Sequence, residues 1–259
     1  MIYMRSFLEE LAKRNKSLYW FGWYNLVLGL ICIALMLFDS QQVLGINRWI
    51  KPIKFFTSVW IMVWSMGWIL FYLDNKRTVK RISWLIIITM FIENFLITMQ
   101  SARGVSSHFN VSDAFNGMVF STMGIAIIVF TFTAIYAELL FFRQKKFSIH
   151  PAYLWGIRLG LLFFIIFSLE AGFMLSRMSH TVGGPDGGPG LPLINWSTEH
   201  GDLRIAHFLG LHSLQILPLA GHYLFRKSST LVLFGIVYFL LVITILILAL
   251  KGLPLGHFN

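Results

Sequence analysis

Long apolar stretches separated by short polar segments dominate the sequence. Nearly uncharged runs of about 20 residues recur, and at 1.5 Å per residue each forms a helix long enough to cross a hydrocarbon core of roughly 30 Å. A membrane β-barrel would instead need alternating segments of about ten residues. The pattern therefore predicts seven transmembrane helices at residues 17–38, 55–73, 83–100, 115–142, 153–175, 206–225 and 231–250.

The composition indicates an all-α polytopic membrane helix bundle forming a single transmembrane domain over residues 1–259. Hydrophobic residues make up 57% of the chain and charged residues 12%, whereas a soluble domain carries about 25% charged residues. The one cysteine, Cys32, lies in the first apolar run, so neither an intramolecular disulfide nor a cysteine metal cluster is expected. The charged, amphipathic residues 1–16 precede an apolar run too long for a signal-peptide core, so we expect a retained first span.

The distribution of basic residues predicts the orientation. Basic clusters lie before the first span and after the second, fourth and sixth; their members are Arg5, Lys13, Arg14, Lys16, Lys76, Arg77, Lys80, Arg81, Arg143, Lys145, Lys146, Arg226 and Lys227. By the positive-inside rule these segments are cytoplasmic, which places the N-terminus inside and the C-terminus outside. Topology thus explains the excess of 21 Lys and Arg over 11 Asp and Glu without a nucleic-acid partner.

Residues 176–205 form the longest predicted extracytoplasmic connection. Its centre, Gly-Gly-Pro-Asp-Gly-Gly-Pro-Gly at residues 183–190, is unsuited to helix or strand. A disordered linker is one interpretation. A folded lid is the other, because the apolar residues that follow, up to Trp196, favour packing onto the helices.

The entries to two predicted spans suggest an internal repeat. Lys51 and Lys54 precede Phe55, and Arg204 and His207 precede Phe208, so each entry carries a basic pair three residues apart before a phenylalanine. This match is compatible with a three-plus-one-plus-three plan of parallel halves, with the fourth span as connector.

Polar residues collect at one depth, in or near the outer halves of the predicted spans. They come from at least four helices and the adjoining loops: Lys51, Lys54, Glu93, Asn94, Gln100, Arg103, His108, Glu170, Asp202, Arg204, His207, His212 and Gln215. Ionisable residues within spans are costly and usually face the bundle interior or a water-filled cavity. We therefore expect Glu93, Arg103, Arg204 and His212 to line one extracytoplasmic cavity. In the alternative, these residues satisfy helix contacts and the outer cations bind lipid phosphates.

Metal and haem sites fit the sequence less well. His207 and His212 are five residues apart, not the four that place two zinc ligands on one helical face. Bis-histidine haem needs a histidine on each of two helices, and histidines occur within only one predicted span, the sixth. No metal is predicted, and the sequence leaves the cofactor open.

Three segments carry a resemblance: Asn47-Arg-Trp-Ile-Lys-Pro-Ile-Lys-Phe55, Gln100-Ser-Ala-Arg-Gly-Val-Ser-Ser-His-Phe-Asn110 and Gly201-Asp-Leu-Arg-Ile-Ala-His-Phe-Leu-Gly-Leu-His212. They resemble an uncharacterised family of bacterial integral membrane proteins with no established activity. The resemblance implies a bacterial inner membrane and says nothing of the substrate.

Two classes of function use this polar layer. In the first, the protein transports a small molecule or ion: the cations bind an anionic group, and Glu93, Glu170 and His212 relay protons. In the second, it is a membrane-embedded enzyme, in which the glycine-rich loop closes over a lipid or quinone-like substrate and His207 or His212 acts as general base.

Overall fold

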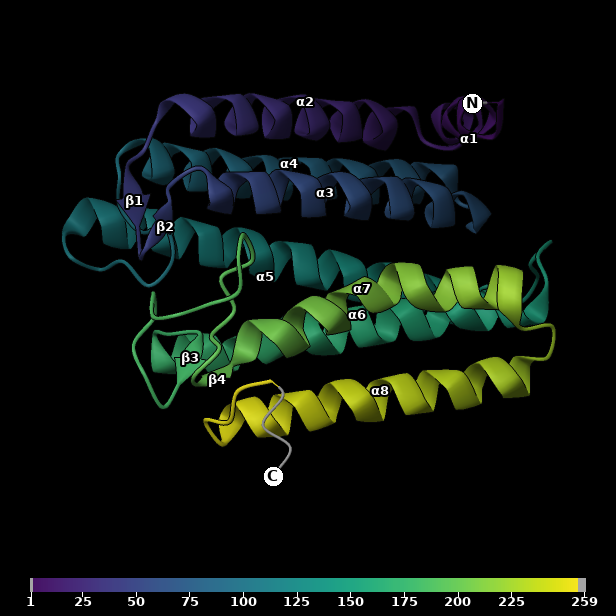
Figure 1. The fold of residues 1–259 in the computed structure, drawn as a ribbon. Coiled ribbons are helices and arrows are strands. Elements are labelled where there is room, and N and C mark those ends of the chain that lie inside the picture. Colours follow the sequence, from purple (N-terminus) through teal and green to yellow (C-terminus); the bar gives the residue numbers. More distant parts are fainter. Residues whose placement is uncertain (1, 256–259) are drawn as a thin grey trace. The chain divides into compact units, whose positions relative to one another are not determined.

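The fold is helical, with two very short two-stranded ribbons (Figure 1). The structure, a computed structural model, describes residues 2–255, with side chains from residue 6 onward, so the Arg5 side chain of the first basic cluster lies outside the described part. In chain order the elements are α1 (Ile2–Arg14), α2 (Lys16–Phe38), β1 (Gln42–Val43), β2 (Ile46–Asn47), α3 (Ile50–Ile69), the 3-10 turn η1 (Leu70–Tyr72), α4 (Lys76–Ala102), α5 (Ala114–Arg143), α6 (Pro151–Arg177), β3 (Thr181–Val182), β4 (Gly201–Asp202), α7 (Leu203–Leu219), the π-helical turn η2 (Ala220–Leu224) and α8 (Ser228–Leu250).

The chain divides into two compact units. The first comprises Met1–Val43 and Asn47–Lys146, and the second Leu44–Ile46 and Phe147–Asn259. Helix α5, the predicted connector between two repeats, belongs to the first unit. Each unit is described by itself.

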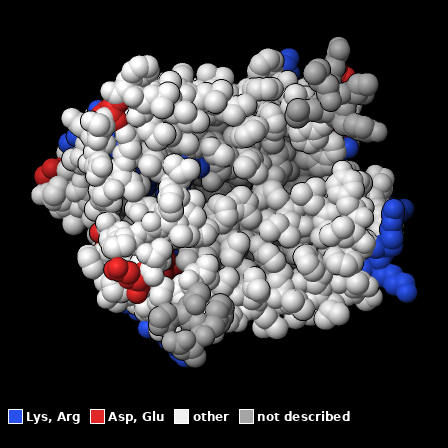
Figure 2. All heavy atoms as spheres, in the orientation of Figure 1, with Lys and Arg blue, Asp and Glu red and all other residues white. Residues whose placement is uncertain are grey.

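Within residues 2–255, six helices are long and apolar enough to cross a membrane, so the chain has the character of a multi-pass membrane protein. They are Lys16–Phe38, Ile50–Tyr72, Lys76–Ala102, Ala114–Arg143, Pro151–Arg177 and Ser228–Leu250. The predicted sixth span, residues 206–225, corresponds to α7 with η2, and the α-helical part of it has only 17 residues. In Figure 2 the flanks of the helices are almost wholly white, and charged atoms gather near helix ends.

Side chains preceding the helices set where several of them begin. Asn15, Asn75 and Asp113 each accept a hydrogen bond from a backbone N–H of the following turn, which satisfies a donor that the helix itself leaves unpaired. Helix α3 begins at Ile50, five residues before the predicted span, because Pro52 is tolerated in a first turn. Lys51 and Lys54 therefore lie on the first turns of α3.

In the first unit, α1 is seen end-on, whereas α2 to α5 run across the view (Figure 1). Helix α1 thus lies crosswise to the bundle. It is held there by Arg14, whose guanidinium carbon lies 3.9 Å from the ring centroid of Trp68 and whose Nη1 donates to Tyr72 Oη at 2.8 Å. Phe7 also stacks on Trp68, with ring centroids 5.1 Å apart. An amphipathic helix in this position suits the membrane–water interface.

In the second unit, α6, α7 and α8 lie side by side (Figure 1), and glycines allow α6 and α7 to approach closely. A Cβ atom on Gly156 would come within 2.5 Å of the carbonyl oxygen of Leu217, and one on Gly160 within 2.9 Å of that of Ser213. The Ser213 hydroxyl donates to the Gly160 carbonyl at 2.9 Å. Small residues and a hydroxyl of this kind are typical of packing between membrane helices.

Pro218 changes the helical register at the end of α7. Proline has no N–H to donate to the preceding turn. The α-helix ends one residue later, at Leu219, and Ala220–Leu224 continues as a π-helical turn in which the Phe225 N–H donates to the Ala220 carbonyl at 2.9 Å. The π-helical turn thus follows almost directly after the proline.

The contact between α6 and α7 predicts the effect of a single added methyl group. Gly156→Ala should lower the stability of the folded protein by about 1–3 kcal/mol, because the new Cβ meets a backbone carbonyl that cannot turn aside. The measurement is the thermal unfolding midpoint of the purified protein in detergent, followed by tryptophan fluorescence.

Gly172→Ala, on the same helix, is the matched control. A Cβ there has nothing within 4 Å, and alanine is the better helix former, so its midpoint should be unchanged or slightly higher. Equal midpoints for the two variants would contradict the proposed contact.

Candidate functional site

In the first unit, the candidate site centres on Glu93 of α4. Glu93 is 2% exposed, and no described residue donates a hydrogen bond to either of its carboxylate oxygens. Lys51 of α3 is the charged residue that acts on it electrostatically. A buried carboxylate is usually paired and hydrogen-bonded, since burial of an isolated charge is costly. Glu93 is therefore a buried acidic group that the described residues leave without hydrogen bonds.

Lys51 also contacts His108, in the loop between α4 and α5. Lys51 Nζ lies 3.1 Å from His108 Nδ1, and Ser107 Oγ lies 3.1 Å from the same nitrogen. Since an ammonium group only donates, this contact requires His108 Nδ1 to be the acceptor and its proton to be on Nε2. Protonation of Nδ1 would thus set two cations against each other. The adjoining Phe109 has a φ of 57°, which is unusual for a phenylalanine.

Asn94, next to Glu93, connects α4 to α2. Its Nδ2 donates to Asn25 Oδ1 at 2.6 Å, and Asn25 Nδ2 donates to the Phe21 carbonyl at 2.7 Å. Both asparagines are buried. Asn25 is not among the residues predicted from the sequence, although it is the one amide in the apolar run 17–38.

Gln100, Arg103 and Asn116 form a second polar group in the first unit, between the end of α4 and the start of α5. Gln100 Nε2 donates to Asn116 Oδ1 at 2.8 Å, and Arg103 Nη1 donates to the same oxygen at 3.0 Å and to Gln100 Oε1. Asn116 Nδ2 in turn donates to Asp113 Oδ2 at 2.6 Å. Asn116 and Asp113 are not among the residues predicted from the sequence. They lie at the N-terminal end of a predicted span, where polar residues are common and give no signal of a site.

In the second unit, His207 of α7 pairs with Glu170 of α6. His207 Nδ1 lies 2.8 Å from the Phe167 carbonyl oxygen and 3.2 Å from Glu170 Oε2. A carbonyl oxygen can only accept, so Nδ1 carries the proton and Nε2 is the basic nitrogen of the neutral ring. Glu170 is buried, and its other oxygen, Oε1, has no hydrogen-bond partner among the described residues.

The remaining predicted residues of the second unit are held by near neighbours in the chain. Arg204 Nε donates to Asp202 Oδ1 at 2.9 Å and its Nη2 to Asp202 Oδ2 at 2.6 Å, which is a bidentate ion pair. His212 Nδ1 lies 3.1 Å from Gln215 Oε1. Two pairs of the predicted polar layer therefore form within α7 and its cap.

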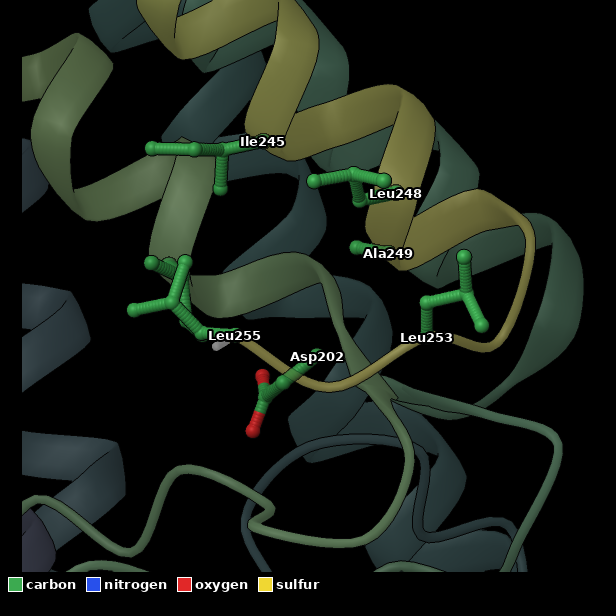
Figure 3. A pocket seen from close by; sticks show the side chains of 7 residues that line it. Asp202, Ile245, Leu248, Ala249, Leu253 and Leu255 are labelled. Carbon is green, nitrogen blue, oxygen red and sulfur yellow. The ribbon is translucent and has the colours of Figure 1, made fainter. Parts of the chain in front are cut away.

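A small hollow in the second unit is too small for a substrate. It has a volume of about 10 Å³, room for roughly one water molecule. Its lining is apolar except for Asp202, whose carboxylate is turned away from Leu248 and Ala249 of α8 (Figure 3). That carboxylate accepts from Arg204 and from the Ser197 N–H at 2.8 Å, so it is already satisfied.

The loop over residues 176–205 is folded. Asp186, in its glycine-rich centre, accepts hydrogen bonds from Ser179 Oγ at 2.9 Å and from the N–H of Thr181 at 2.9 Å, and pairs with His180 Nδ1 at 2.8 Å. Strands β3 and β4 pair antiparallel, Thr181 opposite Asp202. Burial opposes the charge of Asp186, but the hydrogen bond and charge of His180, with the bonds from Thr181 and Ser179, lower the pKa of this carboxyl well below its usual range.

Each unit thus brings part of the predicted layer together. In the first unit, Lys51 acts electrostatically on Glu93 and contacts His108, and Gln100 lies with Arg103; in the second, Glu170 lies with His207. Because Glu93 and Arg103 belong to one unit and Arg204 and His212 to the other, a single shared cavity stays a prediction. Within residues 2–255, no three His, Cys, Asp or Glu side chains are grouped so as to hold a metal ion.

The contacts of Asp186 predict how its removal affects the loop. Hydrogen bonds to a charged group contribute about 1.5–3 kcal/mol, and each 1.4 kcal/mol is a factor of ten. In Asp186→Ala, the backbone N–H groups of His180 and Thr181 should exchange with deuterium roughly ten- to a hundredfold faster at neutral pH, as read by mass spectrometry. Because the pKa is lowered on folding, the wild-type protection should persist as the pH falls through about 4 and be lost only below it.

Glu199→Ala is the control for that experiment. Glu199 lies exposed in the same loop, so its removal should leave the exchange of His180 and Thr181 unchanged. Exchange that is equally fast in wild type and Asp186→Ala would show that the carboxylate does not organise the loop.

Comparison with known proteins adds no function to this geometry. No protein-family model, curated protein or solved structure gives a significant match to the chain.

Proposed function

We propose that the chain is a transporter of the inner membrane of a bacterium, which moves an anionic small molecule together with protons. Seven spans are proposed, with the N-terminus in the cytoplasm and the polar groups opening to the other side. Lys51 and Lys54 attract the anion, and Glu93, Glu170 and His212 take up and release protons.

The state of Glu93 is the observation that carries this proposal. A glutamate that only joined helices would be expected to accept hydrogen bonds from its neighbours, yet no described residue donates to either oxygen. Lys51 acts on it from α3 and also contacts His108. A carboxyl whose charge depends on one nearby ammonium group can gain or lose a proton when an anion draws that ammonium away.

The span that brings the six to seven is proposed for α7 with η2, which is the sixth in chain order. This segment runs beside α6 and α8 in the second unit (Figure 1), and it carries the close glycine contacts that are typical of membrane helices. Basic residues follow it, as they follow the second and fourth predicted spans. Parallel halves with the fourth span as connector remain part of the proposal.

A membrane-embedded enzyme is the second candidate, and the pairing of His207 with Glu170 favours it. The Phe167 carbonyl and Glu170 hold the protonated Nδ1, which leaves Nε2 as a base with a carboxylate behind it. Histidines in acid–base catalysis are commonly held in this way. The substrate in this case is a lipid or quinone-like molecule beneath the loop 176–205.

Reporter fusions test the proposed topology. With seven spans and a cytoplasmic N-terminus, alkaline phosphatase fused to the C-terminus should be active, and green fluorescent protein fused there should stay dark after export through the general secretion route. Fusions after Lys146 should behave in the opposite way, because that loop is basic and expected in the cytoplasm. A bright C-terminal fluorescent fusion would leave six spans and place both termini on one side.

Transport can be tested in liposomes that contain the purified protein and an internal pH dye. Lactate, succinate and phosphate are supplied outside in turn, under an inward proton gradient. At least one of them should speed internal acidification with the wild-type protein, and Glu93→Gln should slow that rate at least tenfold while remaining folded in the membrane.

Glu9→Gln serves as control, since Glu9 lies exposed on α1. If Glu93→Gln acidifies as fast as wild type, or if none of the three anions moves protons, the transporter proposal is wrong. Turnover of a lipid or quinone that requires His207 would favour the enzyme instead.

A further inference from the structure

Three arginines near the predicted outer ends of the spans differ in how their charge is compensated. Arg48 donates from Nε to Asp39 Oδ2 at 2.6 Å and forms an ion pair with it, and Arg204 forms a bidentate ion pair with Asp202. Arg103, by contrast, is held by the neutral amide oxygens of Gln100 and Asn116. No described carboxylate forms an ion pair with it.

The amides fix the position of Arg103 without neutralising it. Gln100 is 0% exposed and Asn116 is 3% exposed, so the two acceptors are rigid parts of the helix contact. Both take their hydrogen bond from one nitrogen, Nη1, and the guanidinium carbon lies 4.6 Å from the ring centroid of Phe115. Nε and Nη2, which form the side of the fork used in bidentate contacts, have no hydrogen-bond partner among the described residues.

We propose that Arg103 is a further oxyanion-binding residue of the first unit, in addition to Lys51 and Lys54, and that Gln100 and Asn116 are its positioning residues. The ligand is a carboxylate or phosphate group, bound through the Nε and Nη2 side of the guanidinium. This inference deepens the proposed transport of an anion and rests on it only for the source of the ligand.

Asp113 is the carboxylate that bears most directly on this assignment. It caps α5 by accepting from the Asn116 N–H at 2.8 Å, and it also accepts from Asn116 Nδ2. Both hydrogen bonds come from Asn116, which in turn accepts a hydrogen bond from the Arg103 guanidinium. Asp113 orients the amide that orients Arg103.

A purely structural link between α4 and α5 would use the same contacts as an oxyanion site. One substitution distinguishes these two roles of Arg103. Gln100→Glu has nearly the same shape and gives Arg103 a carboxylate at the nitrogen it already uses. In a purely structural link, this charge would offset the loss of the Gln100 Nε2 hydrogen bond to Asn116 Oδ1, since a carboxylate has no N–H to donate. An oxyanion site should be lost, because its guanidinium is then neutralised from within.

The experiment measures how fast phenylglyoxal modifies Arg103 in phosphatidylcholine nanodiscs, by peptide mass spectrometry. Phosphate and succinate are the probes, and chloride at equal ionic strength is the control. We expect one of the probes to slow modification of wild-type Arg103 several-fold, with no effect on Arg48, whose charge is already paired. In Gln100→Glu, with an unchanged thermal midpoint, the probes should give no protection.

Arg103→Lys provides a second measure if Gln100→Glu does not fold. It keeps the charge but loses the planar fork, so the affinity for the protecting probe, measured by calorimetry, should fall about tenfold or more. Absence of protection in the wild type, or equal protection in Gln100→Glu, would overturn the proposal. So would an unchanged affinity in Arg103→Lys.

The lipid headgroup is the other source of the same chemistry. If Arg103 is protected in phosphatidylglycerol nanodiscs without added probe, and free phosphate and succinate fail in phosphatidylcholine, a small-molecule ligand is overturned. The transporter proposal fails separately: protection of Arg103 without any proton movement in liposomes contradicts transport and leaves the oxyanion site intact.

Discussion

A polar group removed from water must find its partner within the chain, and most of this structure follows from that constraint. The helices satisfy their own backbone groups, and Asn15, Asn75 and Asp113 satisfy first-turn N–H groups at three helix starts. Where Pro218 interrupts the pattern of α7, a π-helical turn follows directly and keeps the backbone hydrogen-bonded.

The same constraint brings helices together through small residues. In the second unit, Gly210 of α7 lies against the ring of Phe167, where a Cβ would come within 2.0 Å of the ring. This close approach puts His207 within 2.8 Å of the Phe167 carbonyl and fixes which ring nitrogen carries the proton. Backbone packing thus decides the chemistry available at His207, one turn away from the glycine.

Compensation of charge is uneven, and the proposals follow from that unevenness. Asp39 with Arg48, Asp202 with Arg204, and Asp186 with His180 are pairs whose members satisfy one another. Glu93 receives no hydrogen bond from a described residue, and Arg103 is held only by neutral amides. A paired charge stabilises a fold or a loop, whereas a buried carboxyl without hydrogen bonds, or an exposed guanidinium held by neutral amides, is suited to bind a proton or an ion.

Hydrophobic runs alone determined the helical class and nearly all the apolar helices, because a membrane span needs a set length of apolar residues and little else. Helices α3 and α4 begin at Ile50 and Lys76, earlier than the predicted spans. The reason is that charged first turns extend a helix beyond its apolar part. The predicted depth of Glu93, Arg103 and His207 in the membrane also indicated that they belong to one polar layer. Only the tertiary structure showed that Asn25 and Asn116 support this layer, and that Arg204 is neutralised while Arg103 is not. The reason is physical: burial cost depends on residue type and is visible in sequence, whereas compensation depends on which atoms from other helices lie within about 3 Å.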